Sequence, residues 1–192
     1  VVASAGMGVA QKLVGFIMLI PLSFSQAVSA FVAQNYGAKK YNRAKKVLLY
    51  SVATSLACGI VMFYITFFHG NLLSQIFTKD EAVILASWDY MKSYGIDCLF
   101  TAIMVCMVGY FNGCGKTTFV MIQGVIGAFC VRIPVSYLMS KIEPVSLFKV
   151  GLATPASTLV QIILCVSFFV FLSKKSPKED DPIDTYQEIQ AL

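Results

Sequence analysis

Five apolar runs of about 20 residues or more, separated by short polar stretches, make up most of this chain. A helix of about 20 residues is long enough to cross the hydrocarbon layer of a bilayer, which is roughly 30 Å thick. The runs also lack the short apolar–polar alternation of outer-membrane β-strands. We therefore predict an all-α, polytopic membrane helix bundle. Its five transmembrane helices fall at residues 10–36, 47–68, 93–112, 119–140 and 150–172.

Composition excludes a soluble protein. Hydrophobic residues make up 57% of the chain and charged residues only 13%, whereas soluble domains carry roughly 25% charged residues. The net charge is +5, but the basic residues sit at the ends of the predicted helices. This charge therefore indicates membrane topology, with the lipid bilayer as a partner, and does not indicate a nucleic-acid partner.

Basic residues gather on one side of the predicted spans. Four lysines lie on the other side, namely Lys79, Lys92, Lys141 and Lys149. Since cytoplasmic loops carry the excess of Lys and Arg, the richer side is predicted to be cytoplasmic. We expect a multi-pass protein of the cell membrane with a cytoplasmic C-terminus. The nine basic residues of the richer side are Lys39, Lys40, Arg43, Lys45, Lys46, Lys116, Lys174, Lys175 and Lys178.

The two ends of the chain suggest a piece of a longer protein. Val1 is not an initiator, and no basic segment precedes the first apolar run as it would in a signal peptide. Together with the odd number of spans, this predicts a fragment whose N-terminal part is missing. Residues 1–174 form the predicted transmembrane domain. Residues 175–192 are polar and charged, and we predict a disordered cytoplasmic tail there.

Metal and enzyme chemistry have little support in the sequence. The six cysteines are scattered singly, with no CxxC pair and no Cys/His cluster, which argues against a zinc site or a disulfide framework. His69 is the single histidine, and it lies next to Gly70 and Asn71 at an outer helix end. No nucleophile–base pair is apparent. We predict that the protein is not an enzyme and has no resident metal beyond a sodium ion.

One short stretch, YFNGCGKTTF at residues 110–119, looks like the phosphate-binding loop of an ATPase. That motif, G-x-x-x-x-G-K-[ST], requires a glycine where this chain has Tyr110. The stretch also lies between two apolar runs, whereas the motif belongs in an α/β domain. We predict that it binds no ATP and forms a tight cytoplasmic turn, with glycines that allow the chain to reverse.

Small residues and prolines predict how the spans pack. Gly109 and Gly113 form a GxxxG pair, and small residues repeat every four positions at Ser51, Ser55 and Gly59. Such faces allow helix backbones to approach closely within lipid. Prolines interrupt three spans and tend to bend them, as in helices that surround a transport cavity. These prolines are Pro21, Pro134 and Pro155.

Four motifs in order resemble the multidrug and toxic compound extrusion (MATE) family of transporters. The first, LIPLSFSQAVSAFVAQNYGAKKYNRAKK, is similar to the second helix and basic loop of a MATE lobe. The second, FNGCGKTTF, is similar to the turn between the fourth and fifth helices, although Asn112 replaces the usual arginine. VRIPVSYLMS and GLATPAST resemble the following two helices. The matching positions are Gln34, Gly37, Ala38, Arg43, Ala44, Gly113, Gly115, Thr117, Arg132, Ile133 and Pro134.

This resemblance implies a fold and a function. MATE proteins have two six-helix lobes, so the chain would be a C-terminal lobe without its first helix and without the N-terminal lobe. The family exports cationic or amphipathic small molecules in exchange for sodium ions or protons, and it uses no ATP. Two alternatives remain open: a lipid-linked oligosaccharide flippase of the same superfamily, and a non-transporting membrane scaffold subunit.

Asp97 is the first candidate for the coupling chemistry. Ionisable groups within spans are costly, by about 2.5–3.5 kcal/mol on insertion scales, so they tend to be functional. A carboxylate can hold a sodium ion or a proton, and Thr101 lies one helical turn away on the same face. Some MATE members place a cation-binding acid on this helix. The alternative is a structural ion pair or a group at the wet interface.

Two basic residues also fall within predicted spans. Arg132 lies in the outer half of the fourth span, and we expect it to form a buried structural pair with Asp97 or to line a cavity. Lys12 begins the first span. Ser23, Gln26 and Gln34 fall on the same helical face as Lys12, and we expect this polar stripe to line a cavity. Lys12 alone can also snorkel to the outer interface.

Overall fold

The computed structural model describes residues 2–141 and 147–175 of the 192-residue chain. The regular elements of these residues are all helical, which confirms the predicted fold class. In chain order they are α1 (Val2–Ile17), α2 (Leu19–Gly37), α3 (Tyr41–Gln75), α4 (Glu81–Gly113), α5 (Thr117–Val125), the π-helix η1 (Ile126–Arg132), α6 (Ile133–Lys141), α7 (Leu147–Gly151) and α8 (Ala153–Lys175).

Five helical segments are long and apolar enough to cross a membrane, as the sequence predicted. All five are longer than the predicted runs, and the second and third differ most. The second extends over Tyr41–Gln75 and the third over Glu81–Gly113, because further turns at the helix ends continue the same helices. The predicted tail after residue 175 lies outside the described residues. The five segments are Ser4–Gly37, Tyr41–Gln75, Glu81–Gly113, Thr117–Lys141 and Phe148–Lys174.

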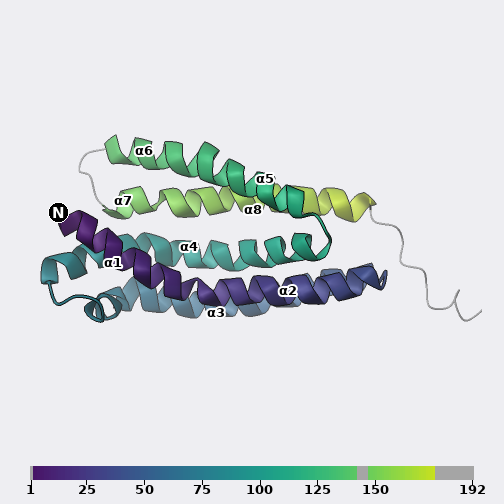
Figure 1. Ribbon diagram of the computed structural model, residues 1–192, viewed down its shortest axis with the longest axis horizontal. Helices are drawn as coiled ribbons and strands as arrows, with labels where there is room; N and C mark the ends of the chain where they lie inside the picture. Colours follow the sequence, from purple (N-terminus) through teal and green to yellow (C-terminus); the bar gives the residue numbers. More distant parts are fainter. Residues whose placement is uncertain (1, 142–146, 176–192) are drawn as a thin grey trace, which may run out of the picture.

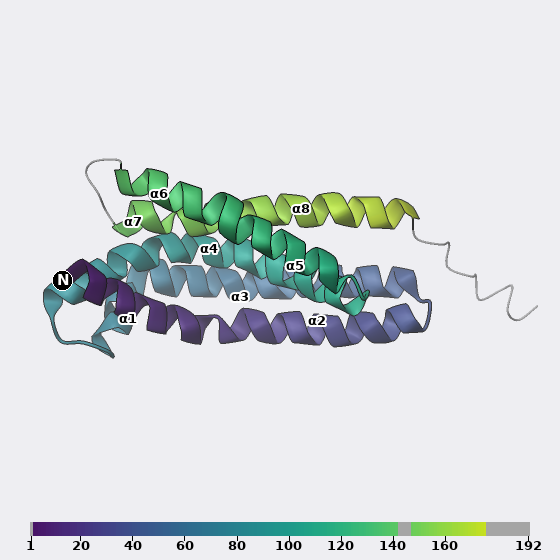
Figure 2. The same cartoon turned by 45° about the horizontal axis from the view of Figure 1, so that its top comes forward.

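α4 forms the centre of the bundle. It packs against α1, α2 and α3 on one side and against α7 and α8 on the other (Figures 1 and 2). In its most apolar 18-residue segment, 67% of the residues are buried within the helix bundle. In the matching segment of each of the other four spans, no more than 17% are buried. A side chain in the middle of α4 is therefore enclosed by protein and not by lipid.

Glycines on α4 and α3 allow the close helix contacts that the sequence predicted. A Cβ atom on Gly113 would lie 2.7 Å from the carbonyl oxygen of Ser29 on α2, and Gly109 makes a similar contact with the carbonyl oxygen of Ser25. On α3, a Cβ on Gly59 would lie 3.1 Å from the Cβ of Ala102. Because no side chain intervenes, α2 and α3 pack directly on the α4 backbone.

The ends of α4 follow from its sequence. Asp80 caps the N-terminus, where its Oδ1 atom accepts hydrogen bonds from the backbone N–H groups of Ala82 and Val83 at 3.0 and 3.4 Å. At the C-terminus Gly115 has a φ of +72°, which glycine adopts without a steric penalty. The run GCGKTT is therefore a tight turn between two membrane helices, in agreement with the sequence interpretation.

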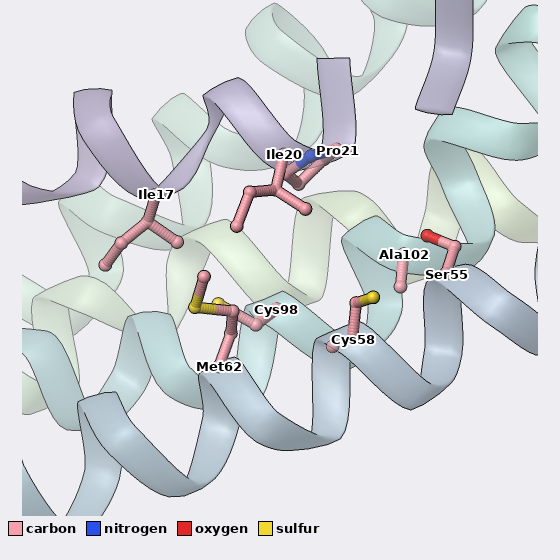
Figure 3. Close-up of a pocket in the computed structure, with 9 residues that line it drawn as sticks. Ile17, Ile20, Pro21, Ser55, Cys58, Met62, Cys98 and Ala102 are labelled. Atoms are coloured by element: carbon pink, nitrogen blue, oxygen red, sulfur yellow. The ribbon is translucent and has the colours of Figure 1, made fainter. Parts of the chain in front are cut away.

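Three spans are interrupted near their prolines. The first breaks into α1 and α2 at Met18, three residues before Pro21. The fourth passes through η1 just before Pro134, and the fifth breaks into α7 and α8 at Leu152, three residues before Pro155. A cavity of about 20 Å³ lies beneath the α1–α2 break. Figure 3 shows Ile17 and Ile20 on the α1–α2 side of this cavity, facing Met62 and Cys98. The cavity is lined mainly by apolar side chains and is about large enough for a single water molecule.

Candidate functional site

Asp97 lies in the middle of α4 and is only 1% exposed. Its Oδ2 atom accepts a hydrogen bond from the Thr101 hydroxyl at 3.1 Å, and its Oδ1 atom accepts one from the Thr158 hydroxyl at 2.7 Å. Both carboxylate oxygens are therefore held by hydroxyl groups from two different helices. We name Asp97, Thr101 and Thr158 the carboxylate site.

The periodicity of the α-helix explains the hydrogen bond between Thr101 and Asp97. Thr101 follows Asp97 by four residues, so it lies on the same face of α4 one turn away. Thr158 comes from α8, which packs beside α4. Its hydroxyl also lies 3.1 Å from the carbonyl oxygen of Thr154, so the side chain is anchored on its own helix as it reaches Asp97.

The carboxylate site provides three oxygen-bearing side chains around one buried point. Hydroxyl and carboxylate oxygens are the ligands of hard cations. A sodium ion or a proton at Asp97 would remove its negative charge, and the threonine hydroxyls stabilise the charged form when the cation leaves. Among the described residues there is no cluster of three or more His, Cys, Asp or Glu side chains that would suit a transition metal.

The ion pair predicted between Asp97 and Arg132 is not among those that the described residues form. Within the described residues Asp97 has hydroxyl partners, and the ion pair that is present joins Lys92 to Asp89 at 3.9 Å. Arg132 is exposed at the end of η1 and lines an open groove with Ser136 and residues near it. The reason is that α8 packs against both α4 and η1, and its Thr158 hydroxyl reaches the Asp97 carboxylate.

The predicted polar stripe lies on the surface of this lobe. Lys12 is exposed on α1, and Ser23, Gln26 and Gln34 are exposed on α2. The Ser23 hydroxyl donates to the carbonyl oxygen of Leu19 on its own helix at 2.8 Å. Polar groups on a membrane helix are expected to face protein or water. Their role as cavity lining remains a prediction.

Sequence reasoning missed a second polar cluster between η1 and α8. The Ser157 hydroxyl donates to the carbonyl oxygen of Gly127 at 2.8 Å, and the Gln161 amide donates to Ser157 at 3.3 Å. Ser157 precedes Thr158, so consecutive residues of α8 bind η1 and Asp97. The signal was present in the run ATPAST, whose small and hydroxyl residues are unusual within an apolar span.

The arrangement of these helices can be compared with known proteins. Residues 2–138 of the chain match the MatE family. The chain belongs to this family. The MatE match agrees with the resemblance found in the four sequence motifs, and it extends from α1 into α6.

Individual MatE relatives cover most of this chain. The protein named "Probable multidrug resistance protein YoeA" from Bacillus subtilis is 23% identical over 181 residues, which is 90% of this chain. Two solved MATE transporter structures of the MOP superfamily share the fold. An inward-facing one matches 88% of the chain with a TM-score of 0.77 and 13% identity. An outward-facing one matches 84% with a TM-score of 0.76 and 16% identity.

The chain covers only part of the length of these proteins. It spans 37% of the Bacillus relative, 40% of the inward-facing chain and 36% of the outward-facing chain. The fold likeness thus concerns one lobe-sized portion of a longer MatE transporter.

Proposed function

We propose that this MatE chain is part of a secondary active exporter of cationic or amphipathic small molecules, driven by exchange with sodium ions or protons. The observation that carries the proposal is the carboxylate site. Asp97 is a fully buried acid in the central span, and within the described part of the chain its hydrogen-bond partners are two hydroxyl groups. A structural ion pair would leave no role for a mobile cation, whereas this site has one charge to neutralise.

The buried carboxylate supports a simple exchange cycle. An uncompensated charge within a membrane span costs about 2.5–3.5 kcal/mol or more, so Asp97 favours the state in which a sodium ion or proton is bound. Thr101 and Thr158 lower the cost of the charged state, because hydrogen bonds to charged groups are worth about 1.5–3 kcal/mol. The site can therefore both take up and release its cation.

We propose that a second lobe completes the transporter and that substrate binds between the lobes. Two observations support this proposal. The chain spans only 37% of the length of the Bacillus relative, and the polar stripe on α1 and α2 is exposed, namely Lys12, Ser23, Gln26 and Gln34. The lobe fits inward-facing and outward-facing structures about equally, with TM-scores of 0.77 and 0.76. Similar fits to both states favour a lobe that moves as a rigid body during alternating access.

The coupling proposal is tested by transport in the full-length protein that contains this chain. Reconstituted vesicles receive an imposed sodium or pH gradient, and efflux of an organic cation is measured for wild type and Asp97→Asn. Asp89→Asn is the matched control. Asp89 lies two turns into α4, is half-buried, pairs with Lys92 at 3.9 Å and accepts a hydrogen bond from the Phe148 backbone N–H at 3.3 Å, and it is not part of the carboxylate site. We expect Asp97→Asn to abolish gradient-driven efflux and Asp89→Asn to retain it. Unchanged efflux in Asp97→Asn would remove Asp97 from the mechanism.

We also propose that the protein lies in the cell membrane and that its C-terminus, its α2–α3 turn and its α4–α5 turn face the cytoplasm. The support is the excess of Lys and Arg at that end of the bundle. A cysteine introduced at Lys116 should react with an impermeant maleimide only in inside-out vesicles, and one at Lys79 only in right-side-out vesicles. The reverse pattern would invert the topology.

A further inference from the structure

Positive charge is strongly segregated between the two ends of the bundle. The α2–α3 turn, the α4–α5 turn and the end of α8 lie together at one end (Figure 1). Six of the seven basic side chains described there are exposed, and Lys45 is half-buried. We call this surface the basic end. It comprises Lys39, Lys40, Arg43, Lys45, Lys46, Lys116 and Lys174.

No acidic side chain among the described residues neutralises the basic end. The acidic residues in the described ranges are Asp80, Glu81 and Asp89, which lie at the opposite end, and Asp97 at the centre of α4. At the opposite end, acidic side chains have partners within the protein. Asp80 caps the N-terminus of α4, and Asp89 forms an ion pair with Lys92. By contrast, α3 and α5 begin at the basic end with no acidic residue in their first turns.

Aromatic residues place the basic end at the level of lipid headgroups. Tyr36 and Tyr41 pack edge to face across the α2–α3 turn, with ring centroids 5.0 Å apart. Tyr50 lies further along α3 and is 68% exposed. Tyrosines gather at membrane–water interfaces, where the ring is in the apolar layer and the hydroxyl is in the polar layer. Arg43 and Lys46 lie between Tyr41 and Tyr50 and so belong to the same interfacial zone.

We propose that the basic end is a binding surface for the phosphate headgroups of anionic membrane lipids. Its chemistry is that of a phosphate site, with one Arg and six Lys side chains and, within the ranges that the structure describes, no carboxylate beside them. Each Lys or Arg near an anionic surface contributes attraction, and clusters of four to eight basic residues beside a membrane helix recognise such lipids. This inference goes beyond the proposed transport function and does not depend on it.

Two other sources of negative charge would compete for the same surface. One is soluble phosphate. The other is the acidic C-terminal segment of this chain, which lies outside the described residues and carries Glu179, Asp180, Asp181, Asp184 and Glu188. A membrane lipid is favoured over soluble phosphate, because the interfacial tyrosines hold the basic side chains against the headgroup layer, where lipid phosphate is concentrated.

The test uses the full-length protein purified in an uncharged detergent. Phosphatidylglycerol or phosphatidylcholine is titrated in mixed micelles, and the thermal unfolding midpoint and retained lipid are measured. The basic-end variant carries Lys39→Gln, Lys40→Gln and Lys46→Gln. The matched control removes the same charge from the opposite end with Lys79→Gln, Lys92→Gln and Lys141→Gln. Inorganic phosphate at equal ionic strength and a chain truncated after Lys175 form two further arms.

We expect phosphatidylglycerol to stabilise the wild type more than phosphatidylcholine does. The effect should shrink between about 0.1 M and about 1 M salt, as the Debye length falls from about 10 Å to about 3 Å. The basic-end variant should need at least about tenfold more phosphatidylglycerol for half of the effect, and the control less than about twofold more. If the basic-end variant is unfolded without lipid, the wild-type comparison of the two lipids and its salt dependence decide the question.

Three results would overturn the proposal. The first is equal stabilisation by the two lipids in the intact protein. The second is stabilisation by inorganic phosphate that matches phosphatidylglycerol, which would assign the surface to a soluble anion. The third is a preference for phosphatidylglycerol that appears only after truncation, which would assign the surface to the C-terminal segment.

Discussion

Thr158 on α8 donates a 2.7 Å hydrogen bond to Asp97 on α4, across 61 residues of the chain. This bond joins the last span to the central span at the point where the proposed cation would bind. Because α8 also holds η1 through Ser157, the carboxylate is linked to three of the five spans.

We predict that Thr158→Val tightens proton binding at Asp97 in the full-length protein, because the charged carboxylate loses a hydrogen bond. The substitution removes one hydroxyl from the carboxylate but keeps the shape of the side chain. A hydrogen bond to a charged group is worth about 1.5–3 kcal/mol, so the proton concentration for half-maximal efflux should fall roughly tenfold to hundredfold. Thr158→Ser keeps the hydroxyl and should remain near wild type. Equal kinetics for the valine and serine variants would contradict this role.

A second prediction concerns the bond between α8 and η1. Ser157→Ala removes the 2.8 Å hydrogen bond to the Gly127 carbonyl, and buried bonds between membrane helices average about 0.6 kcal/mol with a maximum of about 1.7. The thermal unfolding midpoint should fall by a small, measurable amount. Ser167→Ala is the control, because Ser167 is exposed and bonds to Ile163 on its own helix at 2.8 Å. An equal effect of both changes would argue against the interhelical bond.

The contact of α2 with α4 gives a third prediction. A methyl group at Gly113 would lie 2.7 Å from the Ser29 carbonyl oxygen and 2.7 Å from the Cβ of Val32, so the helices must move apart. Overpacking of this kind typically costs about 1–3 kcal/mol. Gly113→Ala should lower the unfolding midpoint. Gly124→Ala has open space around it and should be neutral or stabilising, since alanine favours a helix over glycine. The reverse order of stabilities would be inconsistent with the close contact.

The turn after α4 provides a fourth prediction. Gly115 has a φ of +72°, which costs an L-residue about 1–2 kcal/mol. Gly115→Ala should therefore destabilise the protein in thermal unfolding, although no neighbour lies within 4 Å of the added Cβ. Gly37→Ala also adds a methyl group in open space but at a helix end without a positive φ, and it should be tolerated. Loss of stability in the Gly37 variant alone would contradict the backbone argument.

The sequence was sufficient to predict the helical spans and the turn at Gly115. Long apolar runs have few alternatives in a membrane, where every backbone polar group must be satisfied within the chain. The pairing of Asp97 with Thr101 was also predictable, because it depends only on a spacing of four residues along one helix.

The rest of the site depends on which helices are neighbours. Arg132 was expected beside Asp97 because the third and fourth spans are consecutive in the chain. In the structure the last span also packs against the third, and it contributes Thr158 to Asp97. Helix order in the chain does not fix helix order in space, and a single hydroxyl residue in an apolar span gives no signal of its partner 61 residues away.

Whether Asp97 binds the coupling cation is tested most closely by measuring cation binding itself. Equilibrium binding of radioactive sodium and proton release are measured on the purified full-length protein, with Asp97→Asn beside the Asp89→Asn control. We expect Asp97→Asn to lose one sodium or proton equivalent per protein and Asp89→Asn to keep it. Full cation stoichiometry in a folded Asp97→Asn protein would show that the coupling cation does not bind at Asp97.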